Sequence, residues 1–128
     1  MGDTTKRILL VEDHDDVREV TAMVLRGAGY DVAVAGTKAE AIRLCKEQTF
    51  SLLLGDIGLP DGNGYDLMRD LAKICNIKGI AFTGYGREAD VINARTAGYS
   101  AHLVKPVDLD ILIETVGKLL QELQTQPS

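Results

Sequence analysis

The stretch Leu52-Leu53-Leu54-Gly55-Asp56 is an unbroken apolar run that stops at an acidic residue. Short apolar runs of this kind are typical of strands that are buried on both faces of a parallel sheet. Three other runs also stop at polar residues: Ile8 to Val11 before Glu12-Asp13, Ile80 to Phe82 before Thr83, and Leu103-Val104 before Lys105. Because the loops past the carboxyl ends of parallel strands form the ligand site, we expect these polar side chains to meet in one pocket.

Strand and helix signals alternate five times along the chain. We expect strands over 8–11, 30–35, 52–56, 79–83 and 101–105, and helices over about 15–27, 37–48, 65–75, 87–97 and 106–124. Two local signals support these helices: Thr37-Lys38-Ala39-Glu40 is a capping box, and Pro106 is placed to start the last helix. Right-handed crossovers then predict an α/β, three-layer, doubly wound (βα)5 sandwich around a parallel five-stranded sheet. Of the doubly wound orders, the flavodoxin-like order 2-1-3-4-5 fits five strands and puts the first beside the third.

Length and composition are those of one globular domain. The chain has 128 residues, which we divide into an extended or disordered N-terminus (1–6), a domain (7–124) and a tail (125–128). The net charge of −5 comes without a basic cluster, which argues against direct nucleic-acid binding. No apolar stretch suits a membrane span or a signal peptide, so we expect a cytoplasmic protein. Cys45 and Cys75 fit no disulfide framework or metal motif and are expected to be buried thiols.

The four polar strand ends resemble the receiver domain of bacterial response regulators, the phosphoacceptor half of two-component signalling, with its CheY-like fold. Val11-Glu12-Asp13 resembles the acidic pair of the family, and the stretch from Asp56 to Gly64 resembles its phosphorylation-site loop. Phe82-Thr83-Gly84 and Val104-Lys105-Pro106 resemble its threonine and its Lys-Pro pair. CheY is itself a known example of the 2-1-3-4-5 order, so that order adds no independent support.

Clustered carboxylates call for a cation. Two carboxylates roughly 5 Å apart repel by about 3 kcal/mol at an effective dielectric constant of 20. Oxygen ligands favour Mg²⁺, with Mn²⁺ as a substitute, and Mg²⁺ shares its shell with water and phosphate. We predict Asp13 and Asp56 as direct ligands and Glu12 as a ligand through water. The resemblance adds the backbone carbonyl of Gly58.

The resemblance also implies roles in phosphoryl transfer. Asp56 would be the nucleophile that accepts a phosphoryl group from a phosphohistidine. Lys105 would pair with the phosphoryl oxygens, and the Lys105–Pro106 peptide bond would be cis. Thr83 would donate its hydroxyl, while backbone N–H groups at Gly58 and Gly84 would contact the same oxygens. The phosphodonor would be a histidine kinase or a histidine phosphotransfer protein.

Phosphorylation would then change a binding face. The shift of Thr83 would bias the face formed by the fourth helix, fifth strand and fifth helix. His102 stands where the family often has an inward-turning Tyr or Phe, so switching could depend on pH, although a half-buried histidine without a role is an equal alternative. The output would be a downstream protein or the remainder of a parent chain, without direct contact to nucleic acid or membrane.

Several alternatives stay open. The chain could be a pseudo-receiver that only binds partners, or an aspartate-nucleophile phosphatase, although Gly58 stands where haloacid-dehalogenase enzymes have a second acid. We expect a phosphoacceptor rather than a stand-alone turnover enzyme. The sequence fits either a single-domain regulator or a piece of a larger chain, with a slight preference for a hybrid histidine kinase. It assigns no role to His14, Gly55 or Tyr85.

Overall fold

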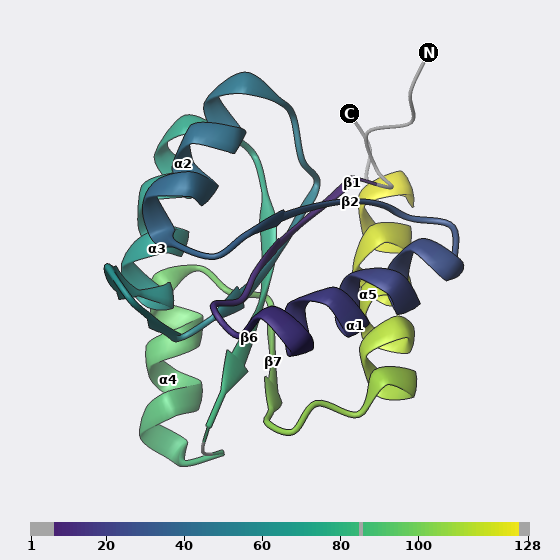
Figure 1. The fold of residues 1–128 in the computed structure, drawn as a ribbon. Helices are drawn as coiled ribbons and strands as arrows, with labels where there is room; N and C mark the ends of the chain where they lie inside the picture. Colours follow the sequence, from purple (N-terminus) through teal and green to yellow (C-terminus); the bar gives the residue numbers. More distant parts are fainter. Residues whose placement is uncertain (1–6, 85, 126–128) are drawn as a thin grey trace.

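The structure, a computed structural model, describes residues 7–84 and 86–125, so the prediction for residues 1–6 lies outside the described residues. Parallel strands form one five-stranded sheet in the order β2-β1-β3-β6-β7, which confirms the predicted order 2-1-3-4-5 (Figure 1). These strands are β1 (Arg7–Val11), β2 (Asp31–Ala35), β3 (Leu52–Asp56), β6 (Lys78–Thr83) and β7 (Ala101–Val104). The helices are α1 (Asp15–Gly27), α2 (Lys38–Glu47), α3 (Gly64–Ile74), α4 (Glu88–Ala97) and α5 (Leu109–Thr125). A short hairpin, β4 (Gly58–Leu59) and β5 (Gly62–Asn63), follows β3.

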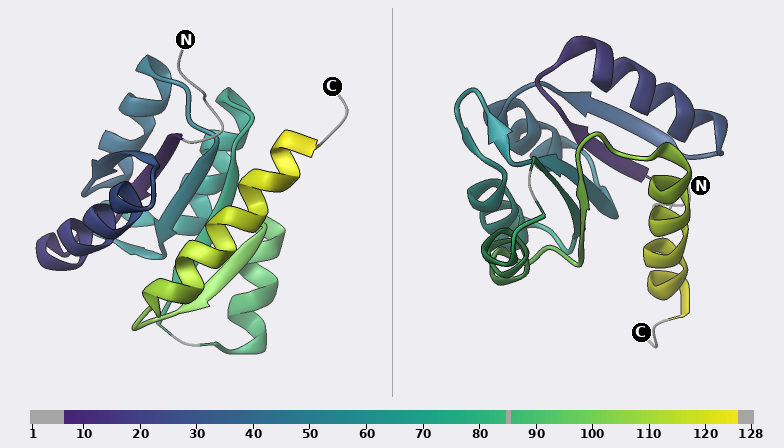
Figure 2. Two further views of the ribbon diagram at one scale, coloured as in Figure 1. Left: turned by 90° about the vertical axis from the view of Figure 1, so that its right-hand side faces the viewer. Right: turned by 90° about the horizontal axis from the view of Figure 1, so that it is seen from below.

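Helices cover both faces of the sheet. Figures 1 and 2 show α2, α3 and α4 on one face and α1 and α5 on the other. Neighbouring residues of a strand point to opposite faces, so Leu53 packs with the first group of helices while Leu52 and Leu54 pack with the second. All of β3 is buried, which explains why its sequence is apolar without alternation.

Two helix starts illustrate how local chemistry sets the boundaries. The N-cap half of the capping box predicted at α2 is confirmed, because the Thr37 hydroxyl accepts a hydrogen bond from the Glu40 N–H at 3.1 Å. The prediction that Pro106 starts the last helix is wrong, since α5 begins only at Leu109. Instead the Asp108 carboxylate accepts hydrogen bonds from the N–H groups of Asp110 (2.9 Å) and Ile111 (3.2 Å), which makes it the cap.

The ends of the described region add two observations. Helix α5 runs one residue into the predicted tail, as far as Thr125. Among the described residues, no helix combines the length and apolar character needed to span a lipid bilayer.

Candidate functional site

The candidate site lies at the carboxyl edge of the sheet, where β1 has β2 on one side and β3 on the other. Glu12 and Asp13 directly follow β1, and Asp56 is the last residue of β3. The chain leaves β1 and β3 towards helices on opposite faces, which opens a crevice between these strand ends. The sheet topology therefore gathers acidic residues that are 43 or more positions apart in sequence (13 to 56).

Lys105 connects the acidic residues of the two strands. Its Nζ lies 2.7 Å from Asp56 Oδ1 and 3.5 Å from Glu12 Oε2. Glu12 and Asp56 are only 1% and 3% exposed, whereas the Lys105 side chain is 31% exposed. The structure thus brings these three predicted site residues into direct contact, with the ammonium between two buried carboxylates.

A divalent cation fits the same residues. Ligand atoms of Glu12, Asp13, His14 and Asp56 all lie within 4.8 Å of one another. Among the described residues, Asp13 Oδ1 is buried and makes no hydrogen bond, and the His14 ring nitrogen lies 3.3 Å from it, so a cation could still bind it. Three carboxylates from two strands provide oxygen ligands of the kind that Mg²⁺ uses together with water and phosphate.

Burial changes the pKa values of Asp56 and Lys105. Desolvation raises the pKa of Asp56, and the charge of Glu12 adds to this increase, while Lys105 opposes it. Burial would lower the pKa of Lys105, but its hydrogen bond and attraction to Asp56 outweigh that effect and raise the pKa. Ionised Asp56 is therefore held at a cost in the metal-free protein, and a cation beside it would relieve that cost.

The other predicted residues surround this centre. Thr83 ends β6, is 3% exposed, and follows Phe82, the β6 partner of Asp56 in the sheet register. Its carbonyl accepts a hydrogen bond from the Lys105 N–H at 2.7 Å, and the Lys105–Pro106 bond is cis, as the resemblance implied. Gly84 is exposed, with open space where a side chain would lie.

Two further predicted residues, Gly58 and His102, lie in different places: Gly58 contacts Asp56, and His102 lies in β7 beside α4. The Gly58 N–H donates a hydrogen bond to Asp56 Oδ1 at 3.3 Å, so this part of the loop faces the Asp56 carboxylate. His102 is half-buried in β7 and lines a small pocket against α4. Tyr85 lies outside the described residues.

Sequence reasoning missed Tyr99, which explains Gly55. Tyr99 is 4% exposed, and its hydroxyl donates to the Gly64 carbonyl at 2.7 Å, at the start of α3. A Cβ on Gly55 would lie 2.5 Å from the Tyr99 hydroxyl, and one on Gly79 would lie 2.6 Å from its ring. Two strand glycines therefore make room for a tyrosine that ties the α4–β7 turn to the loop after Asp56. A glycine inside a predicted central strand was the available signal, since it often marks a close approach.

Replacing Asp56 with asparagine is expected to stabilise the metal-free protein. Because the folded state raises the pKa of Asp56, ionisation costs stability above that pKa, and the cost disappears below the unfolded value of about 3.9. Thermal unfolding in EDTA should show a melting temperature roughly 4–8 °C higher for Asp56→Asn at pH 8, for a gain of about 1–2 kcal/mol. The gap should close as the pH falls towards 4. A variant no more stable than the wild type at pH 8 would contradict this expectation.

Comparison with known proteins identifies the family. The family model described as "Response regulator receiver domain" matches residues 8–117. The chain is 34% identical over 116 residues to the chemotaxis protein CheY of Thermotoga maritima, covering 89% of this chain and 97% of that protein. It is 31% identical over 116 residues to the CAI-1 autoinducer sensor kinase/phosphatase CqsS of Vibrio cholerae, covering 88% of this chain.

A solved structure supports the same assignment. The CheY-like response regulator receiver domain protein of Methanospirillum hungatei JF-1 superposes with a TM-score of 0.90 at 32% identity, covering 95% of this chain and 98% of that chain. Other relatives are longer than this chain. It spans 17% of the length of CqsS and 56% of the length of DNA-binding response regulators that it also matches. Together with the acidic crevice and its lysine, these similarities show that the chain belongs to the response regulator receiver domain family.

Proposed function

We propose that this chain is the phosphoacceptor of a two-component phosphorelay, in which Asp56 accepts a phosphoryl group from a phosphohistidine with the help of Mg²⁺. The observation that carries the proposal is the buried Asp56 carboxylate held 2.7 Å from Lys105 beside Glu12, at the crevice between β1 and β3. A buried acid beside two other acids and one lysine is an expensive arrangement for stability alone. It is well suited to binding a cation and a phosphoryl group.

The proposed transfer is a substitution at phosphorus. A carboxylate oxygen of Asp56 forms the new P–O bond while the P–N bond to the donor breaks, and the donor imidazole, already protonated on its other ring nitrogen, leaves as the neutral ring. Asp13, Asp56 and the Gly58 carbonyl would hold Mg²⁺ directly, and Glu12 would hold it through a water molecule. The bound ion would neutralise negative charge on the oxygens of the phosphoryl group. Lys105 moves from pairing with Asp56 to pairing with a phosphoryl oxygen.

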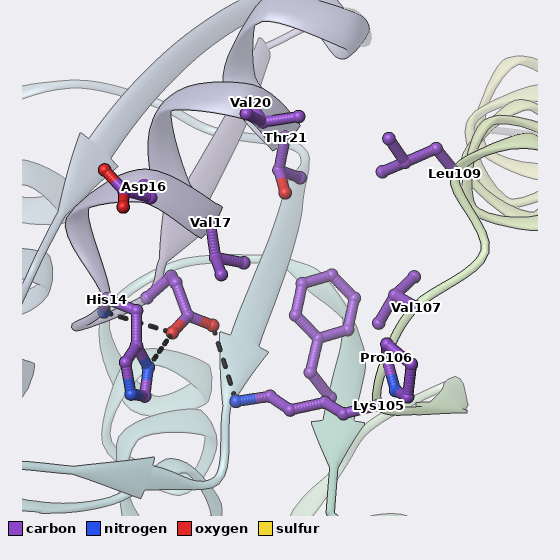
Figure 3. A pocket seen from close by; sticks show the side chains of 11 residues that line it. His14, Asp16, Val17, Val20, Thr21, Lys105, Pro106, Val107 and Leu109 are labelled. Carbon is purple, nitrogen blue, oxygen red and sulfur yellow. Dashed lines mark hydrogen bonds and ion pairs between the residues drawn. The ribbon is translucent and has the colours of Figure 1, made fainter.

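A groove beside the site fits the donor. It has a volume of about 650 Å³ and lies between the start of α1 and the segment that joins β7 to α5 (Figure 3). Glu12 and Lys105 line it together with Val17, Val20 and Leu109, and both valines are about half exposed (52% and 49%). We place the phosphodonor here, because Lys105, which contacts Asp56, lines the groove, and apolar side chains beside it offer a surface for a helix to pack against.

The output follows from the phosphoryl contacts. Thr83 and Lys105 belong to adjacent strand ends joined by a backbone hydrogen bond, so a phosphoryl group bound by both would act on β6 and β7 together. We propose that this biases the face formed by α4, β7 and α5, with His102 as the side chain that turns. Moving such a switch from 1:99 to 99:1 requires about 5.5 kcal/mol of differential binding, to which a charge-assisted contact contributes about 1.5–3 kcal/mol. The recipient is a downstream protein or a further domain of a longer chain.

Labelling by a small phosphodonor tests the proposal. With acetyl phosphate and Mg²⁺, we expect the intact mass to increase by one phosphoryl group that hydroxylamine removes. Asp56→Asn should show no increase, whereas Asp31→Asn, which changes an exposed acid at the opposite end of the sheet, should label like the wild type. Removing Mg²⁺ should slow labelling by roughly 100-fold, because a cation stabilises the transition state by several kcal/mol.

Two results would reject the phosphoacceptor role. The absence of label from any phosphodonor, together with no response to the phosphoryl analogue beryllofluoride in Mg²⁺, would favour a pseudo-receiver that only binds partners. Sustained turnover of small phosphoesters that depends on Asp56 would favour a phosphatase.

A further inference from the structure

His14 is the one member of the acidic cluster that offers nitrogen instead of oxygen. We propose that His14 Nδ1 is an additional metal ligand that extends this site from Mg²⁺ to divalent transition ions that prefer imidazole, with Co²⁺, Ni²⁺ and Zn²⁺ as the class. The inference rests on the proposed function, because it concerns the same cation site. It assigns a specificity-determining role to a residue outside the oxygen ligands.

The ring nitrogen already lies among the carboxylates. Its Nδ1 is 2.9 Å from Glu12 Oε1 and 3.3 Å from Asp13 Oδ1. Two ligands bound at about 2.1 Å to one metal are separated by at most roughly 4.2 Å. The cluster, with all its ligand atoms within 4.8 Å, therefore needs to contract by about 0.6 Å at most to surround an ion.

The backbone holds His14 in this place. His14 is the N-cap residue of α1, in an extended conformation (φ −82°, ψ 115°), and its side chain makes no capping hydrogen bond. Its backbone N–H donates to Glu12 Oε1 at 3.1 Å, which folds the turn back over the acidic pair. Figure 3 shows the ring beside that carboxylate, with Nδ1 facing it. The side chain is 69% exposed, so the ring can adjust to an ion without disturbing the core.

Metal preference follows from the ligand types. Mg²⁺ binds oxygen and keeps several waters, so an imidazole adds little to its affinity. Imidazole suits Zn²⁺, Ni²⁺ and related ions, whose affinities for mixed nitrogen and oxygen sites increase from Mn²⁺ through Co²⁺ to Cu²⁺. A histidine that only hydrogen-bonds Glu12 would change the affinity for all divalent ions by a similar factor. The difference between ions therefore separates a ligand from a structural residue.

The test measures Mg²⁺ and Co²⁺ affinities by calorimetry at pH 8 on the full chain. His14→Ala should weaken Co²⁺ binding by tenfold or more and change Mg²⁺ affinity by less than threefold. The control is Asp31→Asn, which changes an exposed acid at the opposite end of the sheet and should leave both affinities unchanged. In the Co²⁺-loaded wild type, proton NMR should show strongly shifted ring C–H signals that are absent from His14→Ala. Asp56→Asn should lower the affinity for both ions, which would show that they bind at this site and not at the cysteines.

The outcomes keep the two proposals apart. Equal Co²⁺ affinity in wild type and His14→Ala, or equal weakening of Co²⁺ and Mg²⁺, would overturn the role of His14 while leaving phosphorylation of Asp56 intact. Failure of the proposed function would instead appear as a wild-type protein that neither binds Mg²⁺ nor acquires the phosphoryl label.

Discussion

Gly55→Ala is expected to lower the free energy of unfolding by about 3 kcal/mol, although it adds one methyl group. The new Cβ would lie 2.5 Å from the Tyr99 hydroxyl and 3.4 Å from the ring carbon that carries it. Tyr99 is almost fully buried, so it can move only by displacing its neighbours and breaking its hydrogen bond to Gly64. Overpacking and a buried Tyr99 hydroxyl that loses its acceptor thus add to each other.

Urea unfolding of four variants tests this expectation. Gly27→Ala is the matched control, since open space surrounds its Cβ position, and it should be neutral or slightly stabilising. Tyr99→Phe removes the oxygen that the new methyl would meet, at a cost of about 1 kcal/mol for the lost hydrogen bond. Combined with Gly55→Ala, it should cost at least 1 kcal/mol less than the two single changes together. Strict additivity would show that Tyr99 does not determine the requirement for glycine.

Lys105→Met is expected to destabilise the metal-free protein by about 2–3 kcal/mol. It removes the ammonium that lies between Glu12 and Asp56, which leaves buried Asp56 without a positive partner and Glu12 with only His14 beside it. Breaking a fully buried ion pair in this way costs about 3–5 kcal/mol. The value here should be smaller, because the Lys105 side chain is 31% exposed and its charge is partly screened by water.

Added Mg²⁺ should restore most of this loss, because the cation replaces the missing positive charge. Lys118→Met is the control, since Lys118 forms an exposed pair with Glu114 on α5 and should contribute less than 1 kcal/mol. Combining Lys105→Met with Asp56→Asn should recover stability in EDTA, because it removes one of the unpaired acids. A Lys105→Met protein as stable as the wild type in EDTA, or equally unstable with and without Mg²⁺, would contradict the proposed charge balance.

The sequence was sufficient for the strand order and for the edge of the sheet where the site lies. Strands that are buried on both faces of a parallel sheet have apolar sequences. The residue that follows such a run therefore lies at the carboxyl edge of the sheet. For this reason Glu12, Asp56 and Lys105 could be expected to meet, and the structure brings them together. The family resemblance added the roles, which no spacing of residues contains.

Features that depend on packing between distant segments could not be predicted. The closeness of Tyr99 to Gly55 depends on how the α4–β7 turn lies over β3, and neither residue marks the other in sequence. The groove beside Lys105 depends on where α5 begins, and the proline signal misplaced that start because Asp108 is the better cap. The ring of His14 faces the acids because both its Nδ1 and its backbone N–H contact the Glu12 carboxylate, and no residue pattern encodes these contacts.

The fit between Tyr99 and the two strand glycines has a consequence for how this family diverges. A relative with a large aliphatic residue at the position of Gly55 has no room for a tyrosine at the position of Tyr99, so these sites should change together across species. Tyrosine should occur with glycine at both strand positions, and smaller residues should replace it elsewhere. Transplanting this chain's β3 into such a relative would open a void, and only the joint exchange of all three positions should preserve a packed interior.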